Sequence, residues 1–515
     1  MKLLFIFFSI NLIILWQKCE SQTPTILWER TYGGSEDEEG SSINLDSLGN
    51  IYVFGYSKSI DNDVSNPMGG SDFWLLKTDE FGSILSNKNF GDFRTDAGKG
   101  SCQTSDGGFI LCGETSSYNL PGFHGGNFGT LDVYVVKVDS LLNLQWHQCY
   151  GSLGDESGIE IKNSGDGGFV FLADVSLNSF GSVPGFYGMH DWWVNKIDSN
   201  GNVVWSKCIG GTGLDVPTSL IVLPDRSIVV TGANGSSDGD VTCDPDKTCR
   251  VVKLDSNGNF VWDRCYGGSS SEMGYDIVEG INGGFYVAAL TSSNDGDVLG
   301  HIGGNDIWLF QADSLGNITW SRCFGGSNTD SPVSISKTSD GGLLVCGKST
   351  SHPSPSLPFD AIIIKTDSVG NLEWQTFLGG SDWDEGLYAK ETSDHNFVVT
   401  GFTKSNDGDI SFNHGNKDIW VVKLEAPVSI EDIPDFRSLS YIIKKSSISL
   451  FFDSKTSNEL YINLFDLVGH QLLNSKYTSL VGENNLVIPV NILPGVYIVK
   501  IRSKKENISF KFIRE

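Results

Sequence analysis

The sequence predicts an all-β fold built from a repeated unit of four short strands. Three features support this prediction, and each recurs seven times: an acidic residue after a glycine-rich turn, a short apolar stretch after a Gly/Asp/Asn turn, and a stretch resembling D-x-W-x-x-K-x-D. The tryptophans at positions 146, 205, 262, 320 and 374 are spaced 59, 57, 58 and 54 residues apart. No helical periodicity interrupts this pattern.

Each unit contains four strands, named A to D here in chain order. Strand A begins at the acidic residue, and the others are represented by "GGFILCG" from Gly107, "DIWLFQAD" from Asp306 and "ITWSRCFGG" from Ile318. Gly, Asp and Asn join A to B and C to D, as in tight hairpins. The strands are apolar on both faces, as expected for small sheets packed between two neighbours. Seven such sheets predict a seven-bladed β-propeller. The alternative is a linear β-solenoid, which needs shorter rungs and capping repeats.

The two ends of the repeat region are incomplete in complementary ways. "ILWERTYGG" from Ile26 is a strand D without its preceding strands, and the last unit ends with the strand C "DIWVVKL" from Asp418. A ring must pair its ends, because unpaired sheet edges invite association with other chains. The N-terminal strand is therefore expected to close a propeller that spans residues 22–427.

The repeated pattern "GGS…D-x-G…D-x-x-GN-x-Y-V-x-G" resembles the bacterial seven-bladed β-propeller repeat family. The resemblance covers about Ile26 to Leu424. It implies the propeller fold and an extracellular setting, and it implies no single activity.

Charge separates the propeller region from the rest of the chain. The chain has a formal net charge of −27, with 36 Lys and Arg against 63 Asp and Glu. From Val428 onward there are 11 basic and 9 acidic residues, so the first 427 residues hold 36 − 11 = 25 basic and 63 − 9 = 54 acidic residues. Such an acidic body argues against binding nucleic acid or anionic lipid and is compatible with binding cations.

The N-terminus has the pattern of a signal peptide over residues 1–21. Lys2 precedes an apolar run from Leu3 to Trp16, and cleavage is predicted before Gln22. The run is short for a membrane anchor, which is the alternative interpretation. A lipoprotein site at Cys19 is disfavoured because "WQK" precedes it. No transmembrane segment is expected in the mature chain.

Residues 428–515 predict a small C-terminal β-sandwich, because two alternating stretches with turns are followed by "ISFKFIRE". The segments "LFDLVGHQLL", "LPGVYIVKI" and "FKFIR" resemble the C-terminal sorting domain of the bacteroidete type IX secretion system. The resemblance implies the type IX secretion machinery as a partner and a secreted or outer-membrane surface location. The Asn-Pro pair common near the start of that family is absent. The alternative is an ordinary accessory sandwich.

The D–A and B–C connections should emerge on one face, which is called the loop face here. They vary in length and carry acids, histidines and aromatics, so a binding site is expected there. One acid begins each strand A, and these seven either hold cations or basic ligands or cap N–H groups of the loops. Recurrence in every unit favours a structural acidic ring. Its members are Glu38, Asp96, Glu156, Asp215, Glu272, Asp330 and Asp384.

Two groups of loop residues are candidates for ligand contacts. Asp295, Asp297, Asp407 and Asp409 alternate with glycine as Ca²⁺ ligands can, although no glutamate of the EF-hand type follows, and solvated Asx-turns are the alternative. No cofactor is required, and Ca²⁺ is the one candidate. The second group is Phe123, Phe186 and Tyr187, with His190 beside them, in the longest loops. These aromatics either stack on a sugar or peptide or pack the loops onto the rim.

Nine cysteines follow the leader, and the export route permits disulfides. The "CDPDKTC" stretch predicts a disulfide between Cys243 and Cys249. A pair between Cys102 and Cys112 is a weaker expectation across a hairpin. The cysteines at positions 149, 208, 265 and 323 share one place on strand D and are expected to be small buried residues.

The sequence contains no G-x-S-x-G, H-E-x-x-H or zinc-type spacing. It favours an exported or cell-surface binding or adhesion protein that presents its D–A and B–C loops to a glycan, protein or cation. A glycan-active hydrolase or lyase is the second hypothesis, because paired carboxylates are plentiful. A structural surface component is the third.

Overall fold

The computed structural model describes residues 23–117, 131–152, 154–176, 183, 185–351, 358–427, 436–444, 447–454, 459–466, 471–490, 495–502 and 507–514. The chain divides into one compact unit of residues 24–426 and a second unit that contains residues 427–515. The predicted signal peptide, residues 1–21, lies outside the described residues.

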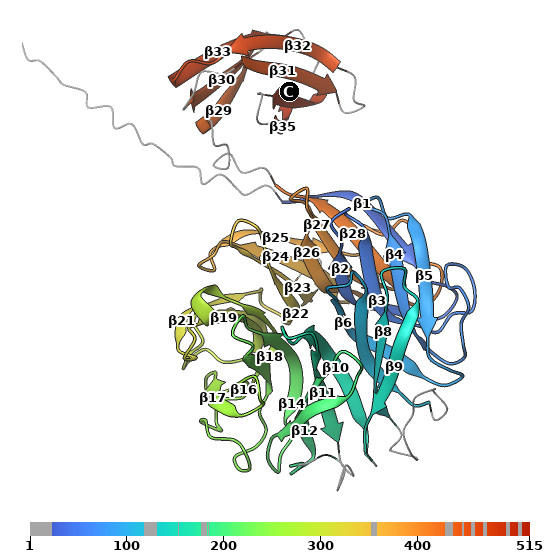
Figure 1. The fold of residues 1–515 in the computed structure, drawn as a ribbon. Helices are drawn as coiled ribbons and strands as arrows, with labels where there is room; N and C mark the ends of the chain where they lie inside the picture. Colours follow the sequence, from blue (N-terminus) through green and yellow to red (C-terminus); the bar gives the residue numbers. More distant parts are fainter. Residues whose placement is uncertain are drawn as a thin grey trace, which may run out of the picture. The chain divides into compact units, whose positions relative to one another are not determined.

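The described part of residues 24–426 forms seven antiparallel sheets of four strands each (Figure 1). The A strands are β2 (Glu38–Leu45), β6 (Asp96–Gln103), β10 (Glu156–Asn163), β14 (Val216–Val222), β18 (Glu272–Glu279), β22 (Asp330–Lys337) and β26 (Asp384–Glu391). The B strands are β3 (Ile51–Ser57), β7 (Phe109–Thr115), β11 (Phe169–Ser176), β15 (Ile228–Ala233), β19 (Phe285–Thr291), β23 (Leu343–Ser349) and β27 (Phe397–Thr403). The C strands are β4 (Asp72–Thr78), β8 (Asp132–Val138), β12 (His190–Ile197), β16 (Cys249–Leu254), β20 (Asp306–Ala312), β24 (Asp360–Thr366) and β28 (Asp418–Glu425). The D strands are β5 (Ile84–Phe90), β9 (Leu144–Tyr150), β13 (Val203–Ile209), β17 (Phe260–Tyr266), β21 (Ile318–Phe324), β25 (Leu372–Leu378) and β1 (Thr25–Tyr32).

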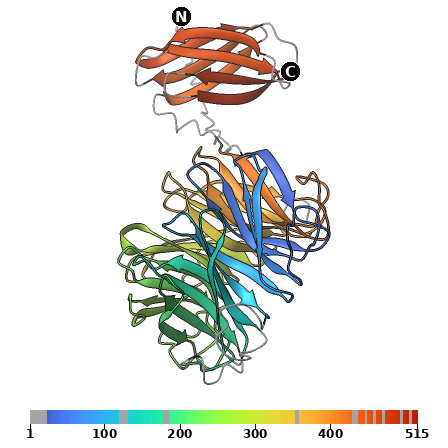
Figure 2. The same ribbon diagram turned by 45° about the vertical axis from the view of Figure 1, so that its right-hand side comes forward.

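The sheets are numbered 1 to 7 here in the order of their A strands, and they follow one another around a ring. Each A strand contacts the A strands of the sheets before and after it, and β2 of sheet 1 contacts β26 of sheet 7. Sheet 7 is completed by β1, which pairs antiparallel with β28 (Figure 2). This is the pairing that the sequence predicts for the two ends of the repeat region. The arrangement is that of a β-propeller repeat.

The sheets are held together by apolar side chains from both faces of each sheet. Between sheets 4 and 5, for example, Trp308 and Phe310 of β20 pack with Val251 of β16, and all three are fully buried. Burying a side chain of this size stabilises the fold by roughly 1.5–3 kcal/mol. This packing explains why the B and C strands are continuous apolar runs rather than alternating ones.

The tryptophans that gave the repeat its period fasten neighbouring sheets at the outer edge. Trp262 of β17 in sheet 4 donates its indole N–H to the carbonyl oxygen of Ser314 in the C–D turn of sheet 5, at 3.3 Å. Trp146 reaches Ser199 of the next sheet in the same way, at 3.0 Å. Trp205 reaches Ser256 at 3.2 Å, whereas the indole N–H of Trp320 has no hydrogen-bond partner within the described residues. The period therefore reflects a contact that several of the units make with the next one.

The unit that contains residues 427–515 holds two further sheets, which have the strand orders β29-β30-β33 and β32-β31-β34-β35. The strands are β29 (Phe436–Lys444), β30 (Ser447–Ser454), β31 (Glu459–Asp466), β32 (Gln471–Thr478), β33 (Gly482–Pro489), β34 (Gly495–Arg502) and β35 (Asn507–Arg514). Residues of both sheets, including Leu450 and Ile462, share one hydrophobic cluster. Within the described residues of the chain, no helix is long and apolar enough to cross a membrane.

Candidate functional site

The seven acids of the predicted ring lie at the loop-face ends of the A strands, where they are almost completely buried. One oxygen of each accepts the backbone N–H four residues earlier, at 2.7 to 3.2 Å. Asp384, for example, accepts the N–H of Gly380 at 2.7 Å and the hydroxyl of Ser405 at 2.8 Å. These carboxylates are therefore engaged by hydrogen-bond donors of their own loops.

A second set of acids, which sequence reasoning did not single out, meets this ring from the C strands. The carboxyl groups of Asp132 and Glu156 converge on Gly151. A Cβ atom on Gly151 would lie 1.8 Å from an oxygen of Asp132 and 2.9 Å from an oxygen of Glu156. The same convergence surrounds Gly210, with Asp191 and Asp215. The glycine of the D–A connection is thus required because two carboxyl groups occupy the space of its side chain.

Burial sets the charge of these carboxyl groups. It raises the pKa of Asp132 to about 7, and the neighbouring charge of Glu156 adds to the effect. Burial likewise raises the pKa of Asp72 and of Asp96 to about 6. Sheet 4 departs from the pattern, because Thr248 replaces the aspartate and bonds to the backbone of Glu272.

The four candidate calcium ligands lie in B–C loops that fold over the glycine-rich turns. Asp295 accepts the N–H of Ser269, and Asp407 accepts that of Ser381, both at 2.7 Å. Asp297 accepts a hydrogen bond from the ammonium of Lys247 at 2.7 Å. Within the described residues, no group of three or more His, Cys, Asp or Glu side chains is placed to hold a metal ion. Calcium binding here stays a prediction.

The predicted aromatic contacts do not form a single cluster in the described residues. Phe123 lies outside those residues. Phe186 packs against the hydrophobic cluster between sheets 2 and 3, whereas Tyr187 is about half exposed. His190 places its Nδ1 2.9 Å from an oxygen of Asp174. Burial raises the pKa of Asp174, and the hydrogen bond with His190 opposes that rise.

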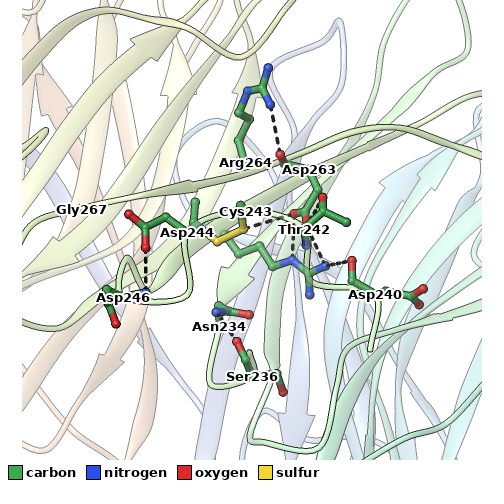
Figure 3. The surroundings of a disulfide bond; sticks show 12 residues. Asn234, Ser236, Asp240, Thr242, Cys243, Asp244, Asp246, Asp263, Arg264 and Gly267 are labelled. Atoms are coloured by element: carbon green, nitrogen blue, oxygen red, sulfur yellow. Dashed lines mark hydrogen bonds and ion pairs between the residues drawn. A yellow bond between two sulfur atoms is a disulfide. The ribbon is translucent and has the colours of Figure 1, made fainter. Parts of the chain in front are cut away.

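The predicted disulfide between Cys243 and Cys249 is wrong, because Cys243 bonds to Cys265 (Figure 3). Cys249 is opposite Tyr266 in the β16–β17 ladder, and Arg250 is opposite Cys265. Alternation along the strands therefore turns Cys249 toward sheet 5 and Cys265 toward the other face. Cys243 lies on the face of Cys265, where its loop contacts Asp263.

Other cysteine expectations are also decided by the register. Cys102 and Cys112 are both free, because the β6–β7 hairpin sets Cys102 opposite Ile110 and Cys112 opposite Gly100. Cys265 is buried, as expected for its place on strand D, but it is bonded to Cys243. Of the equivalent cysteines, Cys208 is free and buried, whereas Cys149 and Cys323 are free and only partly buried.

The loop face of sheets 6, 7 and 1 carries aromatic rings with lysines beside them, and we call this set the aromatic strip. Its members are Tyr56, Phe359, Trp383 and Phe402, with Lys348, Lys404 and Lys417. The ring centre of Trp383 lies 6.1 Å from that of Phe359 and 5.7 Å from that of Phe402. Trp383 is 36% exposed, so its ring is accessible from solvent.

Ammonium groups flank the rings of the aromatic strip. The Nζ of Lys404 lies 5.2 Å from the centre of the Trp383 ring, and that of Lys417 lies 4.7 Å from the Phe402 ring. Lys417 also donates to Glu39 at 2.7 Å, and Lys348 donates to Glu385 at 3.1 Å. Burial raises the pKa of Glu385, and the charge of Lys348 opposes this. The lysines and carboxylates thus form fixed polar groups around an exposed aromatic face.

Sequence reasoning missed this strip because its members come from different repeats. One signal was present, since Trp383 immediately precedes a ring acid. The corresponding position holds Asp, Thr, Leu or Ser in the other six units. A large aromatic side chain at that position is therefore particular to sheet 7.

A serine, a histidine and a glutamate also meet at the opposite end of sheets 6 and 7. Ser339 lies 3.1 Å and Glu391 2.8 Å from the same nitrogen, Nδ1 of His395. A nucleophile activated by histidine needs the serine on one ring nitrogen and the acid on the other. This group therefore lacks the geometry of a catalytic triad.

Comparison with known proteins identifies the C-terminal part of the chain. Residues 444–515 match the secretion system C-terminal sorting domain family. The chain therefore carries a type IX sorting tail, which indicates a secreted or outer-membrane surface location. No relative was found among curated proteins.

Solved structures with a likeness to the chain come from proteins of several kinds. The Pan2 WD40 domain of Neurospora crassa has 11% identity and a TM-score of 0.34, covering 63% of this chain and 93% of that one. A DUF4221 protein of Bacteroides vulgatus has 10% identity and a TM-score of 0.31, covering 67% and 98%. The GH43 protein BlXynB mutant of Bacillus licheniformis has 11% identity and a TM-score of 0.27, covering 79% and 85%. These likenesses assign no activity to the chain.

Proposed function

We propose that the chain is an exported glycan-binding protein that uses the aromatic strip on its loop face. The exposed ring of Trp383, set between two further aromatics and two ammonium groups, is the observation that carries the proposal. A flat aromatic face packs against the apolar face of a sugar ring. Fixed ammonium and carboxylate groups beside it form hydrogen bonds with the sugar hydroxyls.

The strip suits a neutral glycan better than a highly charged one. Lys348 and Lys417 are paired with Glu385 and Glu39, so most of the positive charge is already balanced. The polar groups nevertheless keep directional hydrogen-bonding capacity. Binding to a protein ligand is the alternative outcome of the test below.

We infer that the seven sheets are the blades of one closed propeller and that residues 428–515 form a β-sandwich recognised by the type IX secretion machinery. The ring of A-strand contacts and the β1–β28 pairing support the first inference. The hydrophobic cluster shared by the two sheets of the tail supports the second. Export by this route delivers the loop face to the cell exterior, where glycans are found.

A glycan array probed with the full chain tests the proposal. Trp383→Ala should weaken binding by about tenfold or more, as the loss of a central aromatic contact does. Phe81→Ala is the matched control, because Phe81 is an exposed aromatic at a C–D turn on the other face. Capture of no glycan by the wild-type chain, or equal binding by Trp383→Ala, contradicts the proposal. Release of new reducing ends from the bound glycan would replace it with the hydrolase hypothesis.

A further inference from the structure

A cavity lies among the innermost strands of the ring, apart from the aromatic strip. Its volume is about 410 Å³, and all seven A strands contribute lining residues. This volume falls within the roughly 300–1,000 Å³ range of small-molecule sites. The cavity is therefore large enough for a ligand of the size of a monosaccharide.

The lining of this cavity does not repeat, unlike the acidic ring. Every A strand has a bulge at the same place, and the residue just after it lies four positions beyond the ring acid. At that level the seven sheets carry Ser42, Gly100, Glu160, Ser219, Asp276, Ser334 and Tyr388, and all of these except Ser219 and Ser334 line the cavity. A role in spacing the blades would call for the same residue in each sheet. The variation indicates a role specific to these positions.

The two acids of this level have hydrogen-bond donors from the protein itself. Glu160 accepts a hydrogen bond from the backbone N–H of Leu220 at 2.9 Å and forms an ion pair with Lys162. Asp276 accepts the backbone N–H groups of Ile277 and Ile335, both at 2.8 Å. These carboxylates are therefore already satisfied and are poor candidates for holding a cation.

A single hydroxyl joins the two acids. Ser219 Oγ lies 2.7 Å from Glu160 and 2.6 Å from Asp276. One hydroxyl has one proton to donate, so a second proton must be held on one carboxyl group to complete both hydrogen bonds. Burial, together with the charge of Glu160, raises the pKa of Asp276 to about 6. The acid pair with its serine thus carries about one negative charge in mildly acidic solution.

The polar groups of the cavity that remain available to a ligand are hydrogen-bond donors. Lys390 of β26 lines the cavity, and within the described residues its ammonium forms no hydrogen bond or ion pair. Burial and the charge of Lys162 lower the pKa of Lys390 to about 8. Tyr388 of the same strand also lines the cavity. Lys162 cancels the charge of Glu160, which leaves one uncompensated positive charge.

We propose that this central cavity binds a small monocarboxylate, with the carboxylate on the ammonium of Lys390 and the hydroxyl of Tyr388. A single negative charge balances the one free ammonium. A dianion such as sulfate would leave excess negative charge beside Glu160 and Asp276. The rest of the ligand would face apolar residues of the lining, which include Ile43, Ile221 and Ile335.

Calorimetric titration of the full chain at pH 5.5 tests this site, with lactate and glucuronate as probes and lactamide and glucose as their uncharged counterparts. Both acids should bind, and both uncharged analogues should bind at least about tenfold more weakly, because a charge-assisted hydrogen bond is lost. Equal binding of the uncharged analogues, tighter binding of sulfate than of the acids, or no binding of either acid would overturn the proposal.

Substitutions locate the binding within the cavity. Lys390→Met should weaken lactate binding by about tenfold or more, and Lys390→Arg should restore most of it. Lys337→Met is the matched control, because Lys337 also lines the cavity but lies 3.8 Å from Glu279 at its exposed end. Unchanged affinity in Lys390→Met would exclude the assignment.

The wild-type chain offers a test that does not depend on the folding of any variant. The groups whose charges act on Lys390 are Lys162, Cys102, Glu160 and Asp276. Asp276 gains negative charge above about pH 6, and Lys390 loses its positive charge above about pH 8. Both changes oppose binding of an anion, so affinity should fall from pH 5.5 to pH 9. Affinity that is constant or rising over this range would refute the site.

Discussion

Aspartates occur at both ends of the sheets, and their two environments are opposite. At the A–B and C–D turns the aspartate is exposed and binds its own turn, as Asp313 does with the side chain and N–H of Asn317 and the N–H of Leu315. These bonds lower the pKa of Asp313. At the loop face the carboxyl groups are buried beside one another, and burial raises the pKa of Asp132 to about 7. The turn therefore favours the charged form of Asp313, whereas burial favours the neutral form of Asp132.

This difference separates acids whose partners lie in the same turn from acids whose partners come from a neighbouring sheet. All partners of Asp313 lie within four residues, so its role follows from the turn sequence alone. Asp191 and Asp215 come from the C strand of sheet 3 and the A strand of sheet 4, and they meet only at Gly210. The environment of these loop-face carboxyl groups therefore depends on how neighbouring sheets pack against each other.

The largest effect should come from filling the space that the loop-face carboxyl groups occupy. In Gly210→Ala the new Cβ would lie 2.0 Å from an oxygen of Asp191, so the D–A connection must shift. We expect a loss of about 3 kcal/mol in the free energy of unfolding, measured in urea. Gly167→Ala is the control at an A–B turn, where φ is +96° and no atom lies within 4 Å of the new Cβ. That variant should lose only about 1 kcal/mol. Equal losses would show that the crowding at Gly210 is not important.

The next effect concerns sheet 4, where Thr248 replaces the buried aspartate and a disulfide spans the loop. Cys243→Ser opens a link between residues 22 positions apart, which should cost about 3 kcal/mol of unfolding free energy. Cys249→Ala removes only a small buried side chain and should cost about 1 kcal/mol. Urea unfolding without reductant measures both. Peptide mapping that joined Cys243 to Cys249 would contradict the pairing.

The repeat, the strand order within each sheet and the pairing of β1 with β28 could be predicted from the sequence. They depend on local alternation, on turn residues and on the need to cover sheet edges, and each leaves a periodic trace. The position of the seven ring acids at the starts of the A strands could be predicted for the same reason. The structural role expected for them stays a prediction, and the backbone N–H that each carboxylate accepts supports it.

The disulfide, the aromatic strip and the central cavity could not be predicted in this way. The partner of Cys243 depends on which face of β16 and β17 each cysteine occupies. The aromatic strip and the cavity join side chains that are far apart in the chain, such as Tyr56 with Lys417. Only the closed ring brings them together, and a repeat pattern emphasises the residues that recur rather than those that differ.

The charge difference between the two faces predicts how stability depends on pH. The pKa of Asp132 is about 7 in the folded chain and 3.8 as an ordinary aspartate. The folded state holds its proton more tightly, so the contribution to stability is complete below about pH 3.8 and is lost as the pH rises to about 7. Asp132→Asn cannot ionise, so its unfolding free energy should fall less between pH 4.5 and pH 7.5. The difference from wild type should be on the order of 1 kcal/mol.

Asp139 supplies the control for this titration, because it is exposed at a C–D turn. Hydrogen bonds from the backbone and side chain of Asn143 lower its pKa. Its contribution is therefore present above pH 3.8 and is lost only in stronger acid. Asp139→Asn should leave the slope between pH 4.5 and pH 7.5 unchanged. The two faces would not differ as described if Asp139→Asn flattened the dependence of unfolding free energy on pH. The same would follow if Asp132→Asn did not flatten it.

The smallest expected effect is that of calcium, and it separates two loops that look alike in sequence. Asp297 is neutralised by Lys247, whereas within the described residues Asp407 and Asp409 have no basic partner and border a cavity of about 250 Å³. Calcium at about 5 mM, above the affinity range of extracellular modules, should raise the melting temperature by about 1 °C. EDTA should reverse this rise, Asp409→Asn should abolish it, and Asp297→Asn should leave it in place. A rise that depends on Asp297 would instead show that the ammonium of Lys247 yields to the metal ion, and no rise at all would assign both loops to hydrogen-bonded turns.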